Sequence, residues 1–239
     1  MSAALLQVLP RARVANAFAD EDVEVVSVRL DVTRDALRSA AALLSNDERQ
    51  RASRFAFERD RNRFLAARGR LRELLAARLG VAPAAVQLVY GARGKPALSP
   101  HFADAELHFN VSHCGDVAAY AFARRREVGV DVEHVRLMPD SDEIAARFFS
   151  RRENEAYRAL DPRDKLVGFF NCWTRKEAFV KALGAGVCHA FDSFDVTLAP
   201  GEPAKILRVG RTRGDACRWE LSSFAAEPGC VAAVVVEKS

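Results

Sequence analysis

Two acidic residues stand at alternate positions in the segment Gly-Val-Asp-Val-Glu, residues 129–133. In a β-strand, residues two apart point to the same face, so Asp131 and Glu133 would project side by side while the valines face the core. Two partly buried carboxylates repel each other, and either a raised pKa on one of them or a bound hard divalent cation relieves the repulsion. The alternative without function is a strand that runs out to a solvated edge.

The segment Trp-Thr-Arg-Lys-Glu-Ala-Phe-Val-Lys, residues 173–181, carries a second set of charges inside a long helical pattern. Glu177 and Lys181 follow Trp173 at intervals of four residues, so the three side chains share one stripe of the helix. Lys176 flanks that stripe. A Glu–Lys pair at this spacing is also common surface decoration. Two facts favour function: the tryptophan needs burial, and the chain keeps two lysines here although it has 30 arginines and only six lysines.

A third polar set follows a strand pattern in residues 109–116, Phe-Asn-Val-Ser-His-Cys-Gly-Asp. Alternation directs Asn110 and Ser112 to the face opposite the apolar side chains and leaves His113 at the exit of the strand. Residues at strand ends often carry function, although a single histidine at such a place is more often structural. The five histidines of the chain show no zinc-binding spacing, so we expect no zinc site.

The elements that must position these groups follow from apolar periodicity and capping signals. Strand patterns occur at residues 23–30, 86–90, 107–111, 117–122, 128–132, 194–198, 205–209, 218–224 and 231–237. Helical patterns occur at 33–44, from 46, at 60–79, at 141–149 and at 163–183. Ser45 with Glu48 and Ser150 with Glu153 form capping boxes that start helices.

The basic run at residues 124–126 interrupts the apolar pattern and predicts a junction between residues 1–126 and residues 127–239. Each half then holds a few helices and a small, mainly antiparallel sheet. This predicts an α+β fold built from two similar subdomains packed together.

The composition bounds the class of protein. The chain has 239 residues, of which 49% are hydrophobic and 28% charged, so it can build a core in one large or two modest domains. No apolar run approaches the ~20 residues of a membrane span, and no secretory signal opens the chain. The five cysteines include no Cys-x-x-Cys pair, which is typical of reduced thiols. We therefore expect a cytoplasmic protein that does not enter the membrane.

The motifs Asn-Val-Ser-His, Gly-Val-Asp-Val-Glu and Trp-x-x-Lys-Glu-x-x-x-Lys, in this order and spacing, together resemble the 4′-phosphopantetheinyl transferase superfamily. The resemblance runs from about residue 43 to residue 198. It includes Gly-Ala-Arg-Gly-Lys-Pro at 91–96, Lys-Ala-Leu-Gly-Ala-Gly-Val at 181–187 and Phe-Asp-Ser-Phe-Asp-Val at 191–196. The length and the two similar halves are similar to its larger, pseudo-dimeric type, which activates carrier proteins of nonribosomal peptide and polyketide synthases and which we expect to act as a monomer.

The resemblance implies a reaction. The 4′-phosphopantetheine group of coenzyme A would pass to a serine of an acyl or peptidyl carrier protein, with Mg²⁺ as cofactor and adenosine 3′,5′-bisphosphate as the second product. Asp131, Glu133 and Glu177 would bind Mg²⁺. Glu177, directly or through a metal-bound water, would take the serine proton. Lys181 would stabilise the departing phosphate, because attack at the pyrophosphate builds negative charge there.

By the same resemblance, coenzyme A would bind mainly to the N-terminal subdomain, and Mg²⁺ and the catalytic helix would belong to the C-terminal one. His113, which we also group with the catalytic residues, would contact a phosphate of coenzyme A. Arg51 and Arg63 would hold the 3′-phosphate, and Lys95 and Pro96 would line the nucleotide site. The complete expected substrate-binding set is Arg51, Arg63, Lys95, Pro96, Ser112, His113, Lys176 and Lys181.

Two positions depart from the family pattern. Glu48 stands where several relatives carry a base near the 3′-phosphate, so that contact is missing or is supplied by Arg49. Cys114 follows the motif histidine, where small polar residues are usual. We expect Cys114 to take no part in the chemistry, because no nearby base would activate its thiol.

A basic segment suggests a second function of another class. Residues 49–72 are rich in arginine with interleaved phenylalanines, which could make the chain a nucleic-acid-binding protein without catalysis. The formal net charge is only +4, however, and the segment contains no nucleic-acid-binding motif. Coenzyme A phosphates account for the same arginines, so we expect no nucleic acid among the partners.

Overall fold

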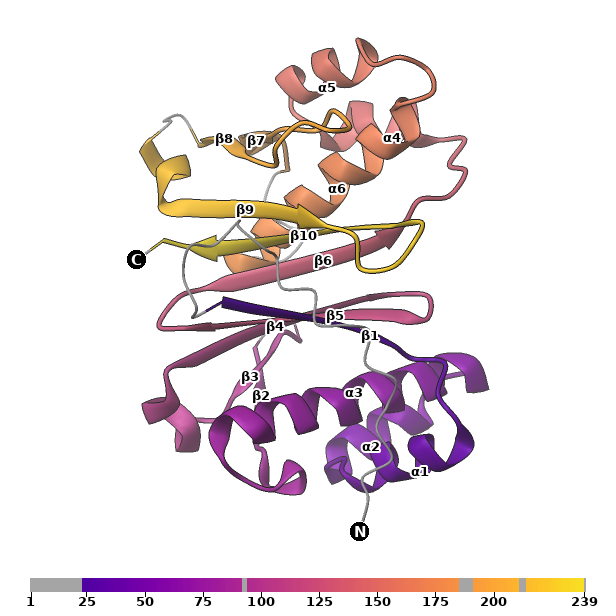
Figure 1. The fold of residues 1–239 in the computed structure, drawn as a ribbon, viewed down its shortest axis with the longest axis vertical. Coiled ribbons are helices and arrows are strands. Elements are labelled where there is room, and N and C mark those ends of the chain that lie inside the picture. Colours follow the sequence, from indigo (N-terminus) through magenta and orange to yellow (C-terminus); the bar gives the residue numbers. More distant parts are fainter. Residues whose placement is uncertain (1–22, 92–93, 185–190, 211–213, 239) are drawn as a thin grey trace.

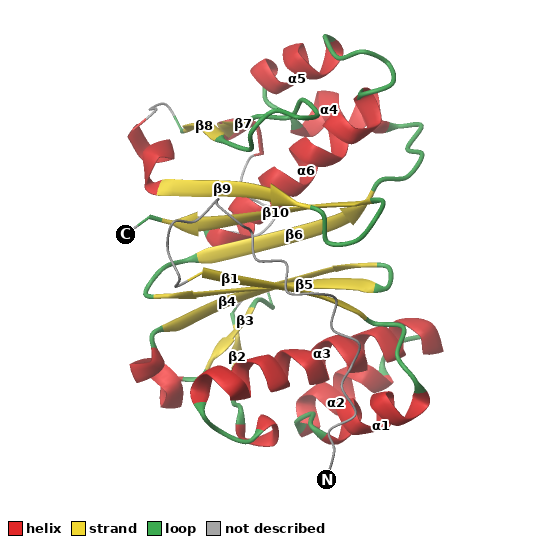
Figure 2. Cartoon of the chain, viewed as in Figure 1, coloured by secondary structure: helices red, strands yellow, loops and turns green. Residues whose placement is uncertain are grey.

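The computed structural model describes residues 23–91, 94–184, 191–210 and 214–238. Helices form the two outer layers of the molecule, and two β-sheets form the two inner layers (Figure 1; Figure 2). Parts of two motifs named above, residues 92–93 and residues 185–187, lie outside the described residues.

The first half of the chain builds one helical layer and one sheet. Its elements are β1 (Val23–Arg29), α1 (Arg34–Ala42), α2 (Asn46–Ser53), α3 (Glu58–Leu79), β2 (Leu88–Tyr90), β3 (Pro96–Leu98), β4 (Leu107–Cys114) and β5 (Val117–Arg124). β5 lies between β1 and β4 in an antiparallel sheet, and β2 and β3 pair as a short hairpin. Helix α3 ends where expected, at Gly80, which takes the left-handed conformation that favours glycine (φ 68°).

The second half builds the other two layers. Its elements are β6 (Val128–His134), α4 (Ser141–Phe148), α5 (Arg151–Arg158), α6 (Lys165–Ala182), β7 (Phe194–Val196), β8 (Ile206–Val209), β9 (Trp219–Phe224) and β10 (Cys230–Glu237). β10 lies between β6 and β9 in a second antiparallel sheet, and β7 pairs with β8.

The two halves share one topology. Each consists of a strand, three helices, a hairpin and two further strands, and in each the last strand lies in the centre of the sheet. The expected α+β fold with two similar, mainly antiparallel subdomains is therefore confirmed. The strand and helix patterns of the sequence indicated this similarity of the two halves, and the structure adds the order of the strands in each sheet.

Strand β5 shows how the layers pack. Tyr120 and Phe122 point into a core shared with α3, whereas Ala119 and Ala121 point into a core shared with the second sheet. Both faces of the strand are buried, so it reads as a continuous apolar run. The alanines on the inner face let the two sheets approach closely.

Several elements differ in extent from the expectation. β4 continues to Cys114, so His113 lies within the strand and not at its exit. β2 has only three residues, and α6 begins at Lys165, after a turn that contains Pro162. In the parts of the chain that the structure describes, no helix is long and apolar enough to cross a membrane.

Candidate active site

Strand β6 carries the two carboxylates on one face, as expected. Val130 and Val132 lie in the core between the sheets, so Asp131 and Glu133 face the opposite way, toward α6. Gly129 makes this approach possible. A Cβ atom at Gly129 would lie 2.1 Å from the carbonyl oxygen of Ala178 in α6, so any larger residue would push the helix away from the strand.

Asp131 joins three elements. Its Oδ1 accepts a hydrogen bond from the Ser112 hydroxyl of β4 at 2.8 Å and lies 2.7 Å from Lys181 Nζ of α6. Lys181 also donates to Ser112 at 2.9 Å. Strands β4 and β6 thus meet under the end of α6, and we call this place, defined by Ser112, Asp131 and Lys181, the β4–β6 seam.

The second carboxylate oxygen of Asp131 has no hydrogen-bond partner among the described residues. The side chain is 7% exposed, and Oδ2 is buried without a hydrogen-bond partner among the described residues. Burial raises the pKa of Asp131, and the charge of Lys181 opposes that rise. A buried carboxylate oxygen without a partner is costly unless something binds it.

Two more carboxylates, those of Glu133 and Glu177, interact electrostatically with Asp131. Burial raises the pKa of Glu177, Lys181 opposes the rise, and the negative charges of Asp131 and Glu133 add to it. Glu133 accepts hydrogen bonds from Arg136 at 3.1 Å and from the Cys114 thiol at 3.2 Å. The carboxylates of β6 and α6 therefore repel one another electrostatically, as carboxylates that share a cation site do before the cation binds.

The carboxylates of Asp131, Glu133 and Glu177 suit a hard divalent cation, since carboxylate oxygens are its preferred ligands. Asp131 Oδ2, which has no hydrogen-bond partner among the described residues, is available to bind one. Within residues 23–91, 94–184, 191–210 and 214–238, however, no three Asp, Glu, His or Cys side chains are gathered closely enough to hold a metal. Asp131 pairs with the ammonium of Lys181 instead. The residues fit the cation by type and by the unpartnered oxygen, and their side chains would have to draw together around it.

Several positive charges act on His113, which directly follows Ser112 of the seam in β4. The side chain of His113 is exposed at the surface, but partial desolvation lowers its pKa, and so do the charges of Lys181, Arg63, Arg51 and Arg68. An imidazole with a lowered pKa is largely neutral at pH 7 and can still donate a hydrogen bond. The charges of these four cations act on His113, and arginines and lysines near one another suit a ligand with several phosphates.

Two family models match this chain. The 4′-phosphopantetheinyl transferase superfamily matches residues 127–235, and the N-terminal region of 4′-phosphopantetheinyl transferase matches residues 31–124. The 4′-phosphopantetheinyl transferase HetI of Nostoc sp. is 40% identical over 216 residues, which make up 90% of this chain and 88% of HetI. The chain belongs to the 4′-phosphopantetheinyl transferase superfamily.

Other relatives agree with this membership. A 4′-phosphopantetheinyl transferase of Bacillus subtilis is 32% identical over 157 residues, which cover 66% of this chain and 67% of that protein. Among solved structures, a holo-(acyl-carrier-protein) synthase of Thermotoga maritima aligns over 47% of this chain and 63% of its own, with 24% identity and a TM-score of 0.37. The family models and the sequence relatives confirm the resemblance seen in the motifs, and the alternative of a nucleic-acid-binding protein gains no support.

In this phosphopantetheinyl transferase, one expected substrate contact is wrong. Lys176 lies in the core with none of its surface exposed. Its Nζ is 2.8 Å from both carboxylate oxygens of Glu153 and 2.8 Å from the carbonyl oxygen of Phe194. A lysine with all its donors engaged in the interior cannot reach a substrate, so Lys176 leaves the expected binding set.

The arginines of the first half take different positions. Arg63 donates to Asp116 at 2.7 Å, and the Arg51 guanidinium lies 5.5 Å from the centre of the Phe64 ring. Arg68, which the sequence did not single out, lies between the rings of Phe64 and Tyr90, 5.5 and 5.8 Å from their centres. Its place one helical turn after Phe64 was the available signal.

Glu48, which departs from the family pattern, is accounted for by its contacts in the folded protein. Glu48 is buried and pairs with Arg72 at 2.6 Å, while it also accepts a hydrogen bond from the Ser45 amide as a capping box requires. Arg49 bonds to Asn46 at 2.8 Å and to the Leu44 carbonyl, so it is held against its own helix. We therefore expect neither Glu48 nor Arg49 to bind the 3′-phosphate.

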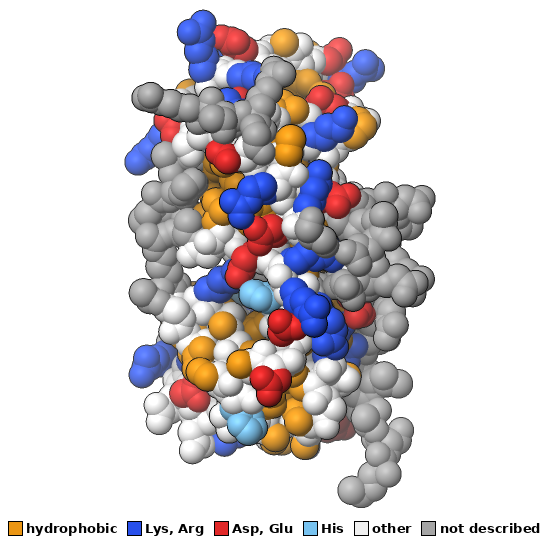
Figure 3. All heavy atoms as spheres, turned by 90° about the vertical axis from the view of Figure 1, so that its left-hand side faces the viewer, with side chains coloured by type: hydrophobic (Ala, Val, Ile, Leu, Met, Phe, Trp, Pro, Cys, Tyr) orange, Lys and Arg blue, Asp and Glu red, His pale blue; other side chains and the backbone are white. Residues whose placement is uncertain are grey.

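Charged side chains are concentrated halfway along the longest axis of the molecule. On the face in Figure 3, basic and acidic side chains and a histidine gather across the middle of the molecule, where Figure 1 shows the two sheets. A cavity of about 570 Å³ includes Lys95 and Pro96 of the expected set, together with His108, Glu127 and Leu183. A substrate-sized cavity thus lies beside the end of α6.

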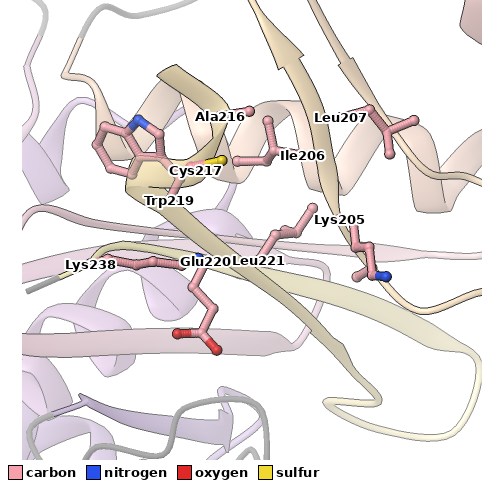
Figure 4. A pocket seen from close by; sticks show the side chains of 10 residues that line it. Lys205, Ile206, Leu207, Ala216, Cys217, Trp219, Glu220, Leu221 and Lys238 are labelled. Carbon is pink, nitrogen blue, oxygen red and sulfur yellow. The ribbon is translucent and has the colours of Figure 1, made fainter. Parts of the chain in front are cut away.

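A second cavity, of about 440 Å³, lies in the second half between β8 and β9 (Figure 4). Trp219, Leu221 and Ile206 give it an apolar wall, and Glu220 stands at its edge. It contains none of the expected site residues, so we do not assign it to the reaction.

Proposed function

We propose that the β4–β6 seam is where this enzyme transfers the 4′-phosphopantetheine group of coenzyme A to a carrier-protein serine. The observation that carries the proposal is the position of Lys181, whose Nζ lies 2.7 Å from Asp131 between an acidic set and a basic set. Family membership supplies the reaction. The serine oxygen forms a bond to the phosphorus next to pantetheine, and the bond from that phosphorus to adenosine 3′,5′-bisphosphate breaks.

Glu177 accepts the proton of the attacking serine. In the metal-free protein, burial and the neighbouring carboxylates raise the pKa of Glu177, and Lys181 opposes the rise. A carboxylate positioned beside a hydroxyl can act as its general base. The proton passes to its carboxylate directly or through one water molecule. Lys181 then stabilises the negative charge that collects on the departing phosphate, because a compact ammonium can approach a single phosphate oxygen.

Asp131, Glu133 and Glu177 would hold Mg²⁺. When bound, the ion neutralises charge on the pyrophosphate. The unpartnered Oδ2 of Asp131 supports this assignment. If the Lys181 side chain turned from Asp131 toward the phosphates, Asp131 Oδ1 would lose its contact with the ammonium and could also bind the ion.

The basic set holds coenzyme A. His113 donates to a phosphate, and Arg51 and Arg63 grip the 3′-phosphate with their planar forks. Arg68 adds a third arginine to this set and lies beside the Tyr90 ring. Lys95 and Pro96 line the cavity next to the seam, and Ser112 holds Lys181 in place.

The carrier proteins of nonribosomal peptide and polyketide synthases are the proposed partners. The enzyme would act as a monomer in the cytoplasm, with no nucleic acid and no membrane among its partners. Both halves needed for the seam come from one chain, which supports the monomer.

Intact-mass measurement tests the function. The enzyme is incubated with coenzyme A, Mg²⁺ and a panel of apo-carriers, namely peptidyl, polyketide acyl and fatty-acid acyl carrier proteins. We expect at least one carrier to gain the mass of one phosphopantetheine group, and only when coenzyme A and Mg²⁺ are both present. The same carrier with its acceptor serine changed to alanine is the control. No mass gain in any carrier would contradict the proposal.

A further inference from the structure

Arg68 of α3 carries a charge that is almost wholly buried in the first half of the chain. Its side chain is 11% exposed, and its guanidinium lies between the rings of Phe64 and Tyr90. The guanidinium of Arg51 in α2 also contacts the Phe64 ring. Contact between cations and aromatic rings is attractive, so the rings hold two guanidinium groups near each other.

The guanidinium of Arg68 has an unused donor. Its Nη1 is buried and has no hydrogen-bond partner among the described residues. The Nε atom lies 3.6 Å from Glu48 Oε1, which is too long for a hydrogen bond, and that oxygen is likewise unpartnered. A buried guanidinium N–H without an acceptor is costly, so this position favours the binding of an anion.

The buried charges around Glu48 do not balance. Its Oε2 lies 2.6 Å from Arg72 Nε and accepts a hydrogen bond from the Ser45 amide. Arg72 is 2% exposed, so one buried carboxylate faces two nearly buried arginines, Arg68 and Arg72. Asp47 is exposed to solvent and bonds to the Ser45 hydroxyl. Two positive charges against one negative charge leave an excess of one, which a bound anion would neutralise.

The charge of Arg68 acts on the proposed site of the reaction. Partial desolvation lowers the pKa of His113 in β4, and the charge of Arg68 lowers it further. The charges of Arg51 and Arg63, to which we assign the 3′-phosphate of coenzyme A, act on the same ring. Tyr90, beside Arg68, ends β2 and directly precedes the 91–96 loop, which carries the expected nucleotide contacts. Arg68 therefore belongs to the surface where that phosphate would bind.

We propose that Arg68 binds the 3′-phosphate of coenzyme A and makes, from α3, the contact that Glu48 cannot make from α2. This role rests on the binding of coenzyme A that is part of the proposed function. A phosphate oxygen would be the acceptor that Nη1 lacks, and its charge would balance the buried cluster. The rings of Phe64 and Tyr90 hold the guanidinium before the ligand arrives, which lowers the conformational cost of binding. Arg68 thus helps the enzyme to distinguish coenzyme A from dephospho-coenzyme A.

Titration calorimetry with coenzyme A and with dephospho-coenzyme A tests this role, because the two ligands differ only in the 3′-phosphate. The measured quantity is the ratio of their dissociation constants. A general loss of folding would weaken both ligands alike and leave the ratio unchanged. We expect Arg68→Gln to bind coenzyme A about 10- to 100-fold more weakly than the parent, as the loss of a charged hydrogen bond implies, and dephospho-coenzyme A less than about threefold more weakly.

Two control variants separate a phosphate contact from a structural role. Arg70→Gln removes a similarly buried arginine of the same helix, which is 14% exposed and pairs with Glu73, and it should keep the parent ratio. Glu48→Gln/Arg68→Gln removes both members of the 3.6 Å pair. If Arg68 acts only by neutralising Glu48, this double variant regains the parent ratio. If Arg68 binds the phosphate itself, the double variant has the ratio of Arg68→Gln.

A parent-like ratio in Arg68→Gln or in the double variant overturns the role of Arg68. A parent that binds the two ligands equally well overturns it too. Transfer of phosphopantetheine to an apo-carrier is measured separately. A parent that prefers coenzyme A, and loses this preference in Arg68→Gln, but transfers nothing would support the phosphate contact and contradict the function proposed for the seam.

Discussion

Two lysines of α6 pair with carboxylates of other elements, Lys176 with Glu153 of α5 and Lys181 with Asp131 of β6, and the two pairs differ in whether every polar atom has a partner. Lys176 is wholly buried, and its three polar contacts go to Glu153 and a backbone carbonyl. Lys181 is 28% exposed and binds one oxygen of Asp131, while the other oxygen is unpartnered among the described residues. Both lysines belong to the same family motif, yet one pair is complete and the other is open.

The difference between the Lys176–Glu153 pair and the Lys181–Asp131 pair indicates their separate roles. Glu153 also accepts hydrogen bonds from the amides of Ser150 and Val196, so the closed pair ties α5 and β7 to α6. Nothing is left there to bind a ligand. The open pair retains a buried oxygen and an accessible ammonium, which are the features a phosphoryl-transfer site needs. We infer that Lys176 serves folding and that Lys181 serves catalysis.

The largest expected effect is on the closed pair. Lys176→Met leaves the Glu153 carboxylate buried without its counter-charge, and the free energy of unfolding should fall by about 3–5 kcal/mol. Urea denaturation followed by circular dichroism measures the change. Lys165→Met, which removes a partly exposed pair, should cost less than about 1 kcal/mol.

Activity separates this effect from a catalytic one. The fraction of Lys176→Met that remains folded at low temperature should transfer phosphopantetheine at a rate close to that of the parent. Loss of transfer with parent-like stability would return Lys176 to the active site.

The next effect concerns the open pair. Lys181→Arg keeps the charge but places a wider, planar group over Asp131, and kcat should fall on the order of 10²-fold at saturating coenzyme A and carrier. Lys181→Met should lose at least as much. The free energy of unfolding should change by less than in Lys176→Met. Parent-like turnover in Lys181→Arg would mean that this lysine has no special role.

The smallest effect is a shift in titration. Partial desolvation and the charges of Lys181, Arg63, Arg51 and Arg68 lower the pKa of His113 in the free enzyme. If His113 lies against a phosphate of coenzyme A, the added negative charge should raise that pKa, since an anion favours the protonated ring. Titration of the ring by NMR, with and without coenzyme A, measures the change. An unchanged pKa would remove His113 from the phosphate site.

Local pattern was enough to predict part of the site. The alternation in 129–133 placed Asp131 and Glu133 on one face, and the helical spacing placed Glu177 and Lys181 on one stripe. Both predictions depend only on residues within a few positions of each other. The capping boxes at Ser45 and Ser150 were predictable for the same reason.

Contacts between distant segments were not predictable in this way. The capping box identified Glu153 as a cap, but nothing near it indicated that Lys176 of another helix would bind the same carboxylate. Glu48 resembled a lost phosphate contact until the fold brought Arg72 to it. The packing of the two sheets against each other is equally non-local, because it depends on small residues in β5 that meet β6 and β10 only after folding.

We propose that the open pair and its neighbouring carboxylates serve catalysis and not folding, and Glu177→Gln tests this most directly. Burial and nearby carboxylates raise the pKa of Glu177 in the folded enzyme. Such a group destabilises the fold progressively as the pH rises from its ordinary pKa through the raised one. The uncharged glutamine should therefore give a metal-free protein that melts higher than the parent at neutral pH and equally near pH 4. Its transfer rate should fall at least on the order of 10²-fold. A Glu177→Gln variant that keeps the parent rate, or that is less stable than the parent at neutral pH, would contradict this assignment.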